Sequence, residues 1–151
     1  MTDLSLADRL RAAMNEARKQ RDQAGTLLLS TILSDIKNRE IELGQTPTDD
    51  ETAEVLRRGV KKRRESVEAY EKAGRTDAAA TEATEIKILE SYLPAAVPAE
   101  DIRAAVREAI AAGAQDMGKV MGAVMPKLKG RADGSLVNTI VREELAASNK
   151  S

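Results

Sequence analysis

Apolar residues recur every three or four positions through nearly the whole chain, and this spacing restricts the fold more than any other feature. The period matches one face of an α-helix, whereas a half-buried strand requires apolar and polar residues to alternate. Glycine or proline interrupts the pattern at intervals, as is usual where helices end. Four helices are therefore expected before Pro94 and three after it, within residues 6–21, 26–44, 48–74, 76–93, 98–113, 116–128 and 133–148.

Several of these segments carry a start signal for a helix. Ser5 precedes the first helix and Asp8 follows three positions later, which is the spacing of a capping box. Thr48 and Glu51 repeat this arrangement before the third helix. Pro126 is expected to kink or end the sixth helix, because it has no N–H group to donate. Further caps are expected at Thr76, Asp116 and Asp133.

The segment between Pro94 and Pro98 is the best candidate for a domain boundary. Two prolines separated by small apolar residues favour a stiff, extended connector. Pro98 also suits the first position of the helix that follows it. The sequence therefore predicts an all-α protein with an N-terminal domain of about four helices, residues 1–95, and a C-terminal three-helix domain, residues 96–151.

The chain contains no cysteine and no histidine, and this absence excludes many kinds of site. Disulfides, thiolate nucleophiles, cysteine or histidine metal sites and His-based catalytic triads all require these residues. No carboxylate pair lies in an apolar context that would separate the two pKa values, so we expect no catalytic residues, no metal and no cofactor. No stretch approaches the roughly 20 apolar residues of a membrane span, so we expect a cytoplasmic protein with no membrane partner.

Basic and acidic residues are nearly balanced, at 24 and 25, so overall charge indicates no particular partner. The densest basic stretch, residues 57–64, is interpreted as a solvated helix face, with an RNA or membrane surface as the alternative. Arg63 falls on the apolar line of its helix, and we expect it to snorkel or to pair with an acidic residue such as Glu82 or Glu85. The acidic residues expected to pair with the basic stretch are Glu54, Glu65 and Glu68.

Two glycines one turn apart, Gly118 and Gly122, lie inside the sixth predicted helix. Glycine inside a helix costs about 1 kcal/mol relative to alanine. These two positions therefore indicate a close approach by another helix or by the backbone of a ligand.

A second glycine-bearing segment follows at residues 126–134. Gly130 and Gly134 flank a turn that places basic side chains beside the helix start at Asp133, where a phosphate group could bind. The alternative is structural, with a glycine that ends one helix and an aspartate that caps the next. The basic residues of this turn are Lys127, Lys129 and Arg131.

Five stretches, taken in order, carry a family resemblance. They are residues 36–43, 64–70, 92–94, 116–122 and 126–134. Across these stretches and nearly its whole length, the chain resembles the YqeY proteins. The C-terminal part of those proteins is also similar to the tail of GatB, the B subunit of the bacterial aspartyl/glutamyl-tRNA amidotransferase. Ser30 departs from the family pattern, since an arginine is common at this position.

The resemblance implies an N-terminal helical domain joined to a three-helix C-terminal domain. It also implies that the second domain contacts tRNA where it is attached to an amidotransferase. We interpret Lys119, Lys127, Lys129 and Arg131 as the residues that contact phosphate. The positions that match the shared motif are Gly118, Lys119, Val120, Met121, Lys127, Gly130, Arg131, Ala132, Asp133 and Gly134.

The leading hypothesis is a tRNA-binding or amidotransferase-associated accessory protein without an active site of its own. A label of glutamine-dependent carbon–nitrogen ligase would be inherited from the shared domain, because the sequence shows neither an activated nucleophile nor a nucleotide-phosphate site. One alternative is a protein–protein adaptor that uses a groove lined by Met117, Met121 and Met125, and the partner could be an amidotransferase or another translation-related protein. A second alternative is an amide-transfer enzyme that uses carboxylates or lysine.

Overall fold

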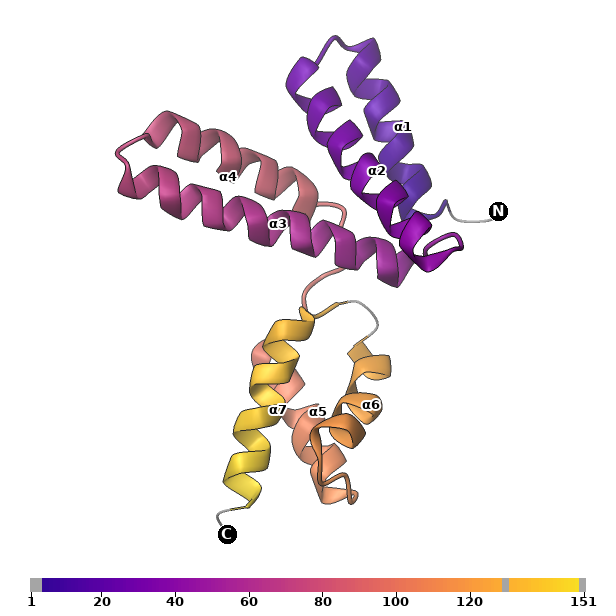
Figure 1. Cartoon of the computed structure of the whole chain (residues 1–151), viewed down its shortest axis with the longest axis vertical. Coiled ribbons are helices and arrows are strands. Elements are labelled where there is room, and N and C mark those ends of the chain that lie inside the picture. Colours follow the sequence, from indigo (N-terminus) through magenta and orange to yellow (C-terminus); the bar gives the residue numbers. More distant parts are fainter. Residues whose placement is uncertain (1–3, 129–130, 150–151) are drawn as a thin grey trace. The chain divides into compact units, whose positions relative to one another are not determined.

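The computed structural model describes residues 4–128 and 131–149, and in these residues it contains seven α-helices and no strand (Figure 1). The predicted all-α class is confirmed. The chain divides into two compact units, Met1–Leu93 and Pro94–Ser151. No helix in the described ranges is long and apolar enough to cross a bilayer. The helices are α1 (Leu6–Lys19), α2 (Gln23–Leu43), α3 (Asp49–Lys72), α4 (Thr76–Glu90), α5 (Ala99–Ala111), α6 (Met117–Leu128) and α7 (Gly134–Ser148).

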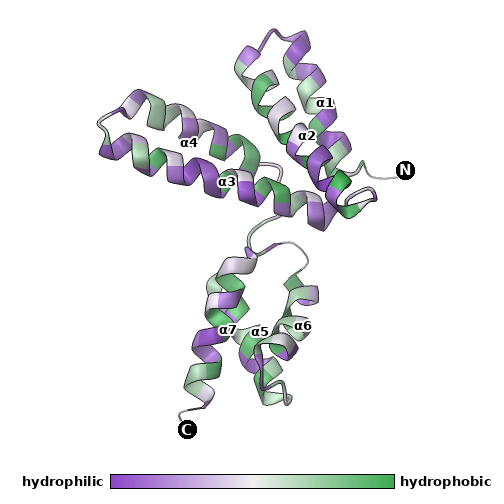
Figure 2. Ribbon diagram, in the orientation of Figure 1, coloured by the Kyte–Doolittle hydropathy of each residue, from purple (hydrophilic) through white to green (hydrophobic). Residues whose placement is uncertain are grey.

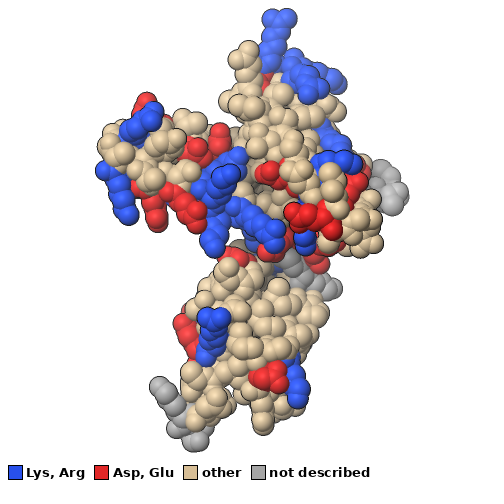
Figure 3. All heavy atoms as spheres, in the orientation of Figure 1, with Lys and Arg blue, Asp and Glu red and all other residues tan. Residues whose placement is uncertain are grey.

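The N-terminal unit consists of two helical hairpins, one formed by α1 and α2 and the other by α3 and α4 (Figure 1). Hydrophobic and hydrophilic residues alternate along each helix (Figure 2), and buried apolar side chains from all four helices form one core cluster. Charged residues of both signs cover the outer surfaces of α3 and α4 (Figure 3). The side chains with least exposure in this core are Leu10, Ile32, Leu56 and Leu89.

The caps of the N-terminal unit agree in part with the predictions. The capping box of Thr48 and Glu51 is formed in both directions, and Ser5 accepts a hydrogen bond from the N–H of Asp8 at 3.1 Å. The second helix begins earlier than predicted, at Gln23, because the Asp22 carboxylate accepts a hydrogen bond from the N–H of Gly25.

The predicted cap at Thr76 is wrong. Thr76 is the first residue of α4, and Arg75 precedes it as an N-cap without a side-chain hydrogen bond. Arg75 instead lies over the ring of Tyr70, with its guanidinium carbon 5.3 Å from the ring centre. The helix α4 therefore begins at Thr76 itself, one residue earlier than a cap at Thr76 would place its start.

Gly59 allows α2, α3 and α4 to approach one another closely. A Cβ atom at this position would lie 3.1 Å from Cδ1 of Ile32 and 3.3 Å from Nη1 of Arg63. That guanidinium folds back over the glycine, donating to the Gly59 carbonyl at 3.1 Å and to the Glu85 carboxylate at 3.0 Å. The predicted pairing of Arg63 with an acidic residue is confirmed, and Glu85 of α4 is the partner.

The C-terminal unit packs α5, α6 and α7 around an aliphatic core (Figures 1 and 2). Pro98 is the N-cap of α5 and not its first residue. Pro126 does not end α6, which continues to Leu128. We attribute this to the burial of Leu128 in the core, which offsets the single hydrogen bond that the proline removes beside the exposed Gly122. The fully buried side chains of this core include Ile102, Val106, Val120 and Val137.

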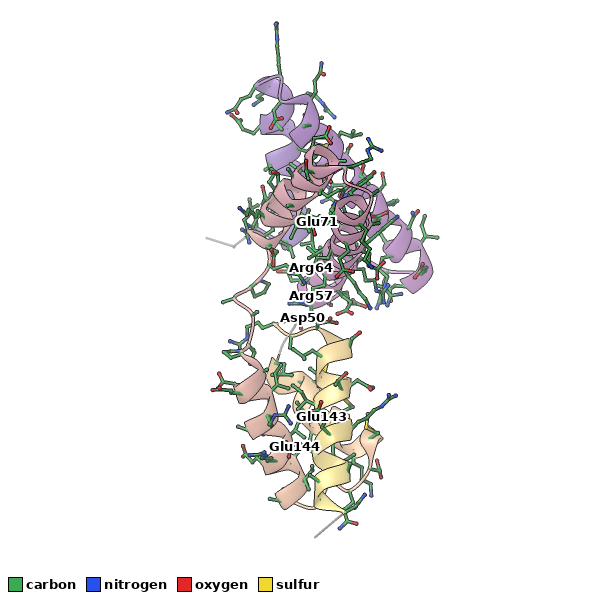
Figure 4. The ribbon with its side chains drawn as sticks, turned by 90° about the vertical axis from the view of Figure 1, so that its left-hand side faces the viewer. Asp50, Arg57, Arg64, Glu71, Glu143 and Glu144 are labelled. Carbon is green, nitrogen blue, oxygen red and sulfur yellow. The ribbon has the colours of Figure 1, made fainter. Side chains whose placement is uncertain are left out.

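A cluster of charged side chains joins α5 to α7 on one side of this core (Figure 4). The Glu144 carboxylate, with 10% of its side chain exposed, accepts hydrogen bonds from Arg103 at 2.7 Å and from Arg107 at 3.0 Å and 3.2 Å. Arg103 also donates to Glu143 at 2.8 Å. The bonds from Arg107 and Arg103 hold the pKa of Glu144 below its ordinary value of 4.5.

We expect Gly59→Ala to lower the free energy of unfolding by about 1 kcal/mol. The new methyl group would overpack the contact with the buried Ile32, and that cost exceeds the gain of about 1 kcal/mol in helix propensity. Urea unfolding followed by circular dichroism measures the difference. A variant as stable as the parent would show that the three helices do not need a glycine here.

Replacing Glu144 with glutamine should lower the free energy of unfolding at neutral pH. It should also make that free energy fall less steeply as the pH is lowered. Because the folded pKa is lowered, the carboxylate stabilises the fold above about pH 4.5 and loses this effect as the pH falls through the folded pKa. Urea unfolding at neutral and acid pH measures both changes. Glu143→Gln is the matched control, since 53% of that side chain is exposed, and an equal loss in both variants would contradict the role of Glu144.

Candidate nucleic-acid interface

Three of the four predicted phosphate contacts lie in the last turn of α6 and in the connection from α6 to α7. Buried side chains of Leu128 and Ala132 anchor this connection on either side. The N–H of Arg131 donates to the Leu128 carbonyl at 2.9 Å, and the Asp133 carboxylate caps α7 by accepting from the N–H of Ser135 at 3.0 Å. Two of the predicted site residues, Lys129 and Gly130, lie outside the described residues.

The connector before α5 also contributes to this candidate site, although no sequence pattern predicts it. The N–H of Val97 donates to the carbonyl of Arg131 at 2.9 Å, so residues 95–98 lie beside the turn between α6 and α7. Together these segments line an open cavity of about 330 Å³, whose lining includes Lys127, Arg131 and the carboxylate residue Asp101. A contact across more than 30 residues leaves no periodic signal in a sequence.

The two described cations of this cavity are only weakly neutralised. Nζ of Lys127 is 4.0 Å from a carboxylate oxygen of Glu108, and both side chains are largely exposed. The side chain of Arg131 is held by one long hydrogen bond, 3.4 Å, to the Leu128 carbonyl. An exposed ion pair such as that of Lys127 contributes little, and the carbonyl that Arg131 contacts carries no net charge, so both positive charges remain available to an anion.

Lys119 lies apart from that pair. Its backbone N–H donates to the capping carboxylate of Asp116 at 2.8 Å, which places it in the first turn of α6. Eight residues of helix separate it from Lys127, a rise of about 12 Å. The structure therefore brings Lys127 and Arg131 to one cavity, and Lys119 lies roughly two turns away on the same helix.

The glycines of α6 and of the α7 start differ from those earlier in the chain. Gly44, Gly74 and Gly113 follow helix ends and have positive φ, and Gly59 is crowded. In contrast, a Cβ on Gly118 would make one ordinary contact of 3.5 Å, to Asp116. Gly122 and Gly134 have nothing within 4 Å of that position and do not have positive φ.

The exposed face of α6 is therefore smooth. Gly118 and Gly122 are exposed with Lys119 beside them, while Val120 and Val124 on the opposite face are buried. No described part of the chain makes the close approach that the sequence predicted at these glycines. Met117, Met121 and Met125, suggested as the lining of a groove, are half-buried and pack against the C-terminal core.

Two other arginines of this unit, Arg103 and Arg107, are occupied by Glu143 and Glu144. Arg142 on α7 is exposed. Within the described ranges, no group of three or more acidic residues could hold a metal ion. The site therefore consists of solvent-facing cations on a glycine-bearing surface, with no arrangement of carboxylates suited to holding a metal.

The basic stretch of the N-terminal unit is partly neutralised. Arg64 pairs with Glu90 of α4 at 3.0 Å, as Arg63 does with Glu85. These partners belong to the neighbouring helix and not to the predicted set of Glu54, Glu65 and Glu68. Figure 3 shows red and blue side chains intermixed over α3 and α4, as expected of a solvated face.

Comparison with known proteins gives matches over most of the chain. A family model described as Yqey-like protein matches residues 7–145. An uncharacterised protein of Schizosaccharomyces pombe is 34% identical over 76 residues, which cover 50% of this chain and 60% of the yeast protein. A Pyrenophora tritici-repentis protein named altered inheritance of mitochondria protein 41, mitochondrial, is 25% identical over 145 residues, covering 92% of this chain and 80% of the fungal protein.

We expect Gly122→Ala to raise the free energy of unfolding by roughly 0.5–1 kcal/mol. The methyl group enters open space, so the gain in helix propensity has no packing cost to offset it. Urea unfolding is again the measurement. A loss of stability would mean that the fold of α6 itself requires glycine at position 122. The absence of a side chain there would then be explained by structure and not by ligand binding.

Proposed function

The chain belongs to the YqeY-like protein family, and we propose that it is a tRNA-binding accessory protein whose C-terminal unit contacts the phosphate backbone. Lys127 and Arg131 would make the main contacts, with Lys119 farther along α6. Lys129 lies outside the described residues, and we include it in the proposal on the basis of the sequence alone. In this proposal the protein supplies binding and no catalytic group, and any amidotransferase would be its partner.

The observation that carries the proposal is the open glycine face of α6. Gly122, inside the helix, costs about 1 kcal/mol relative to alanine, and nothing in the described chain fills the space beside it. Gly118 in the first turn extends the same open face, with only the Asp116 carboxylate near its Cβ position. A surface without side chains lets a polymer backbone approach closely. Lys119 lies beside this face and Lys127 follows two turns later, so an approaching backbone would meet positive charge.

The expected binding mode relies on side chains and not on the start of α7. The Asp133 carboxylate already occupies the N–H of Ser135 and adds a negative charge at that helix end. A phosphate there would be repelled, whereas Lys127 and Arg131 are exposed and weakly paired. Contacts made to phosphate oxygens alone position a nucleic acid without reading its sequence.

The resemblance to the GatB tail supports tRNA as the nucleic acid, since that tail contacts tRNA where it is attached to the amidotransferase. The alternatives of a protein adaptor and an amide-transfer enzyme remain open as proposals. A protein partner that survives nuclease treatment would favour the adaptor, and glutamine hydrolysis or amidation of a misacylated tRNA would favour the enzyme.

A titration of bulk tRNA into the full chain at two salt concentrations tests the proposal. The double variant Lys127→Ala/Arg131→Ala should bind about tenfold more weakly, as expected for two exposed ion pairs. The slope of log affinity against log salt should also become shallower by roughly 2. Arg142→Ala is the control, because it removes an exposed arginine of the same unit away from the cavity.

Absence of tRNA binding by the parent at low salt, or an equal loss in the Arg142→Ala control, would contradict the proposal. Gly122→Ala adds an independent check. It should weaken tRNA binding although it stabilises the fold, because the methyl group would hold the backbone away from α6. Unchanged affinity in this variant would show that the ligand does not contact the glycine face.

A further inference from the structure

The N-terminal unit contains a polar cleft of about 430 Å³, which the proposed tRNA contacts do not use. Its walls come from the second half of α2, the middle of α3 and the middle of α4. The cleft lies wholly within one compact unit. A cavity of this size matches small-molecule sites, which usually range from about 300 to 1,000 Å³.

The floor of the cleft is closely packed and hydrogen-bonded. Gly59 forms part of it, and a Cβ there would contact the buried Ile32 and approach Leu89 at 3.7 Å. The Arg63 guanidinium covers this glycine and is fixed by Glu85, leaving 15% of the arginine side chain exposed. A ligand in the cleft would therefore meet a preformed surface.

The charges that line the cleft are balanced, with four cations and four carboxylates. Two of each are already paired, Arg63 with Glu85 and Arg39 with Glu42, at 3.0 Å and 2.9 Å. The remaining cations, Arg58 and Lys62, are four residues apart on α3 and therefore lie on one face of that helix. The remaining carboxylates are Asp35 on α2 and Glu82 on α4.

None of these last four residues forms an ion pair with another residue that the structure describes. Two hydroxyl groups of the lining add hydrogen-bond acceptors, since Thr31 and Ser66 donate their own hydrogens to the carbonyls of Leu27 and Lys62. The cleft thus offers the two remaining cations on the α3 wall and the two remaining carboxylates on the α2 and α4 walls, with one hydroxyl acceptor each on α2 and α3.

We propose that this cleft binds a small zwitterion of the amino-acid or short-peptide class. The ligand carboxylate would lie between Arg58 and Lys62, and its ammonium group would face Asp35 and Glu82. A phosphate ester or another ligand with net negative charge would meet as many carboxylates as cations. A ligand with net positive charge would likewise be repelled by the cations of the cleft. A ligand that carries one positive and one negative charge at separate ends can pair with the cations and with the carboxylates at the same time.

The test is an amide NMR titration of the isotope-labelled full chain with the dipeptide Ala-Ala. Two blocked forms, N-acetyl-Ala-Ala and Ala-Ala amide, each remove one charge. We expect shifts confined to amides of α2, α3 and α4 that line the cleft, and a loss of about tenfold in affinity for either blocked form. Equal binding of the three forms, or tighter binding of adenosine monophosphate, would overturn the proposal. So would no shift at high millimolar dipeptide.

Two pairs of variants separate the cleft from general charge effects. Lys62→Ala and Glu82→Gln should each weaken dipeptide binding about tenfold. Lys61→Ala and Glu68→Gln change the same residue types on exposed positions of α3 that do not line the cleft, and they should leave affinity unchanged. Equal losses in cleft and control variants would contradict the proposal. Because these residues lie outside the C-terminal unit, the outcome is independent of tRNA binding.

Discussion

The core of this protein is built almost entirely from aliphatic side chains, and this constraint determines how its helices pack. The sequence has no phenylalanine or tryptophan, and Tyr70 and Tyr92 are only half-buried. Leucine, isoleucine, valine and alanine are small, so dispersion contacts form only where helix axes come close. Gly59 is the clearest sign of this need, because it lets α3 meet α2 and α4 without a side chain between them.

Ion pairs between helices restrict how the helices pack, whereas an aliphatic core alone would allow several arrangements. Arg63 with Glu85 links α3 to α4, and Glu144 with its two arginines links α5 to α7. Partly buried pairs add little net stability after desolvation, but breaking one leaves a charge that is costly to bury. We infer that these pairs select one rotation of each helix about its axis.

The sequence predicts the helices well because period and capping are local. The boundaries at Thr48 and Asp133 and the aliphatic stripes of α1 and α7 follow from neighbours within one turn. The misses involve competing or distant groups. The Asp22 carboxylate accepts a hydrogen bond from the N–H of Gly25, so α2 begins earlier than predicted. The cleft between α2, α3 and α4 depends on contacts between residues that are 20 or more positions apart, such as Arg63 and Glu85. Likewise, the hydrogen bond between Val97 and Arg131 forms part of the candidate site without any pattern in the sequence.

The hairpin arrangement of the N-terminal unit also affects how fast it acquires its structure. Most of its packing joins helices that follow each other directly in the chain, so little loop entropy is lost before contacts form. Proteins dominated by such local contacts fold on microsecond to millisecond timescales. The hydrogen bond from the N–H of Leu6 to the carboxylate of Asp49 spans 43 residues and links the first hairpin to the second, so closing this contact costs more loop entropy. The cleft between α2, α3 and α4 therefore depends on the docking of the two hairpins and not on the packing inside either one.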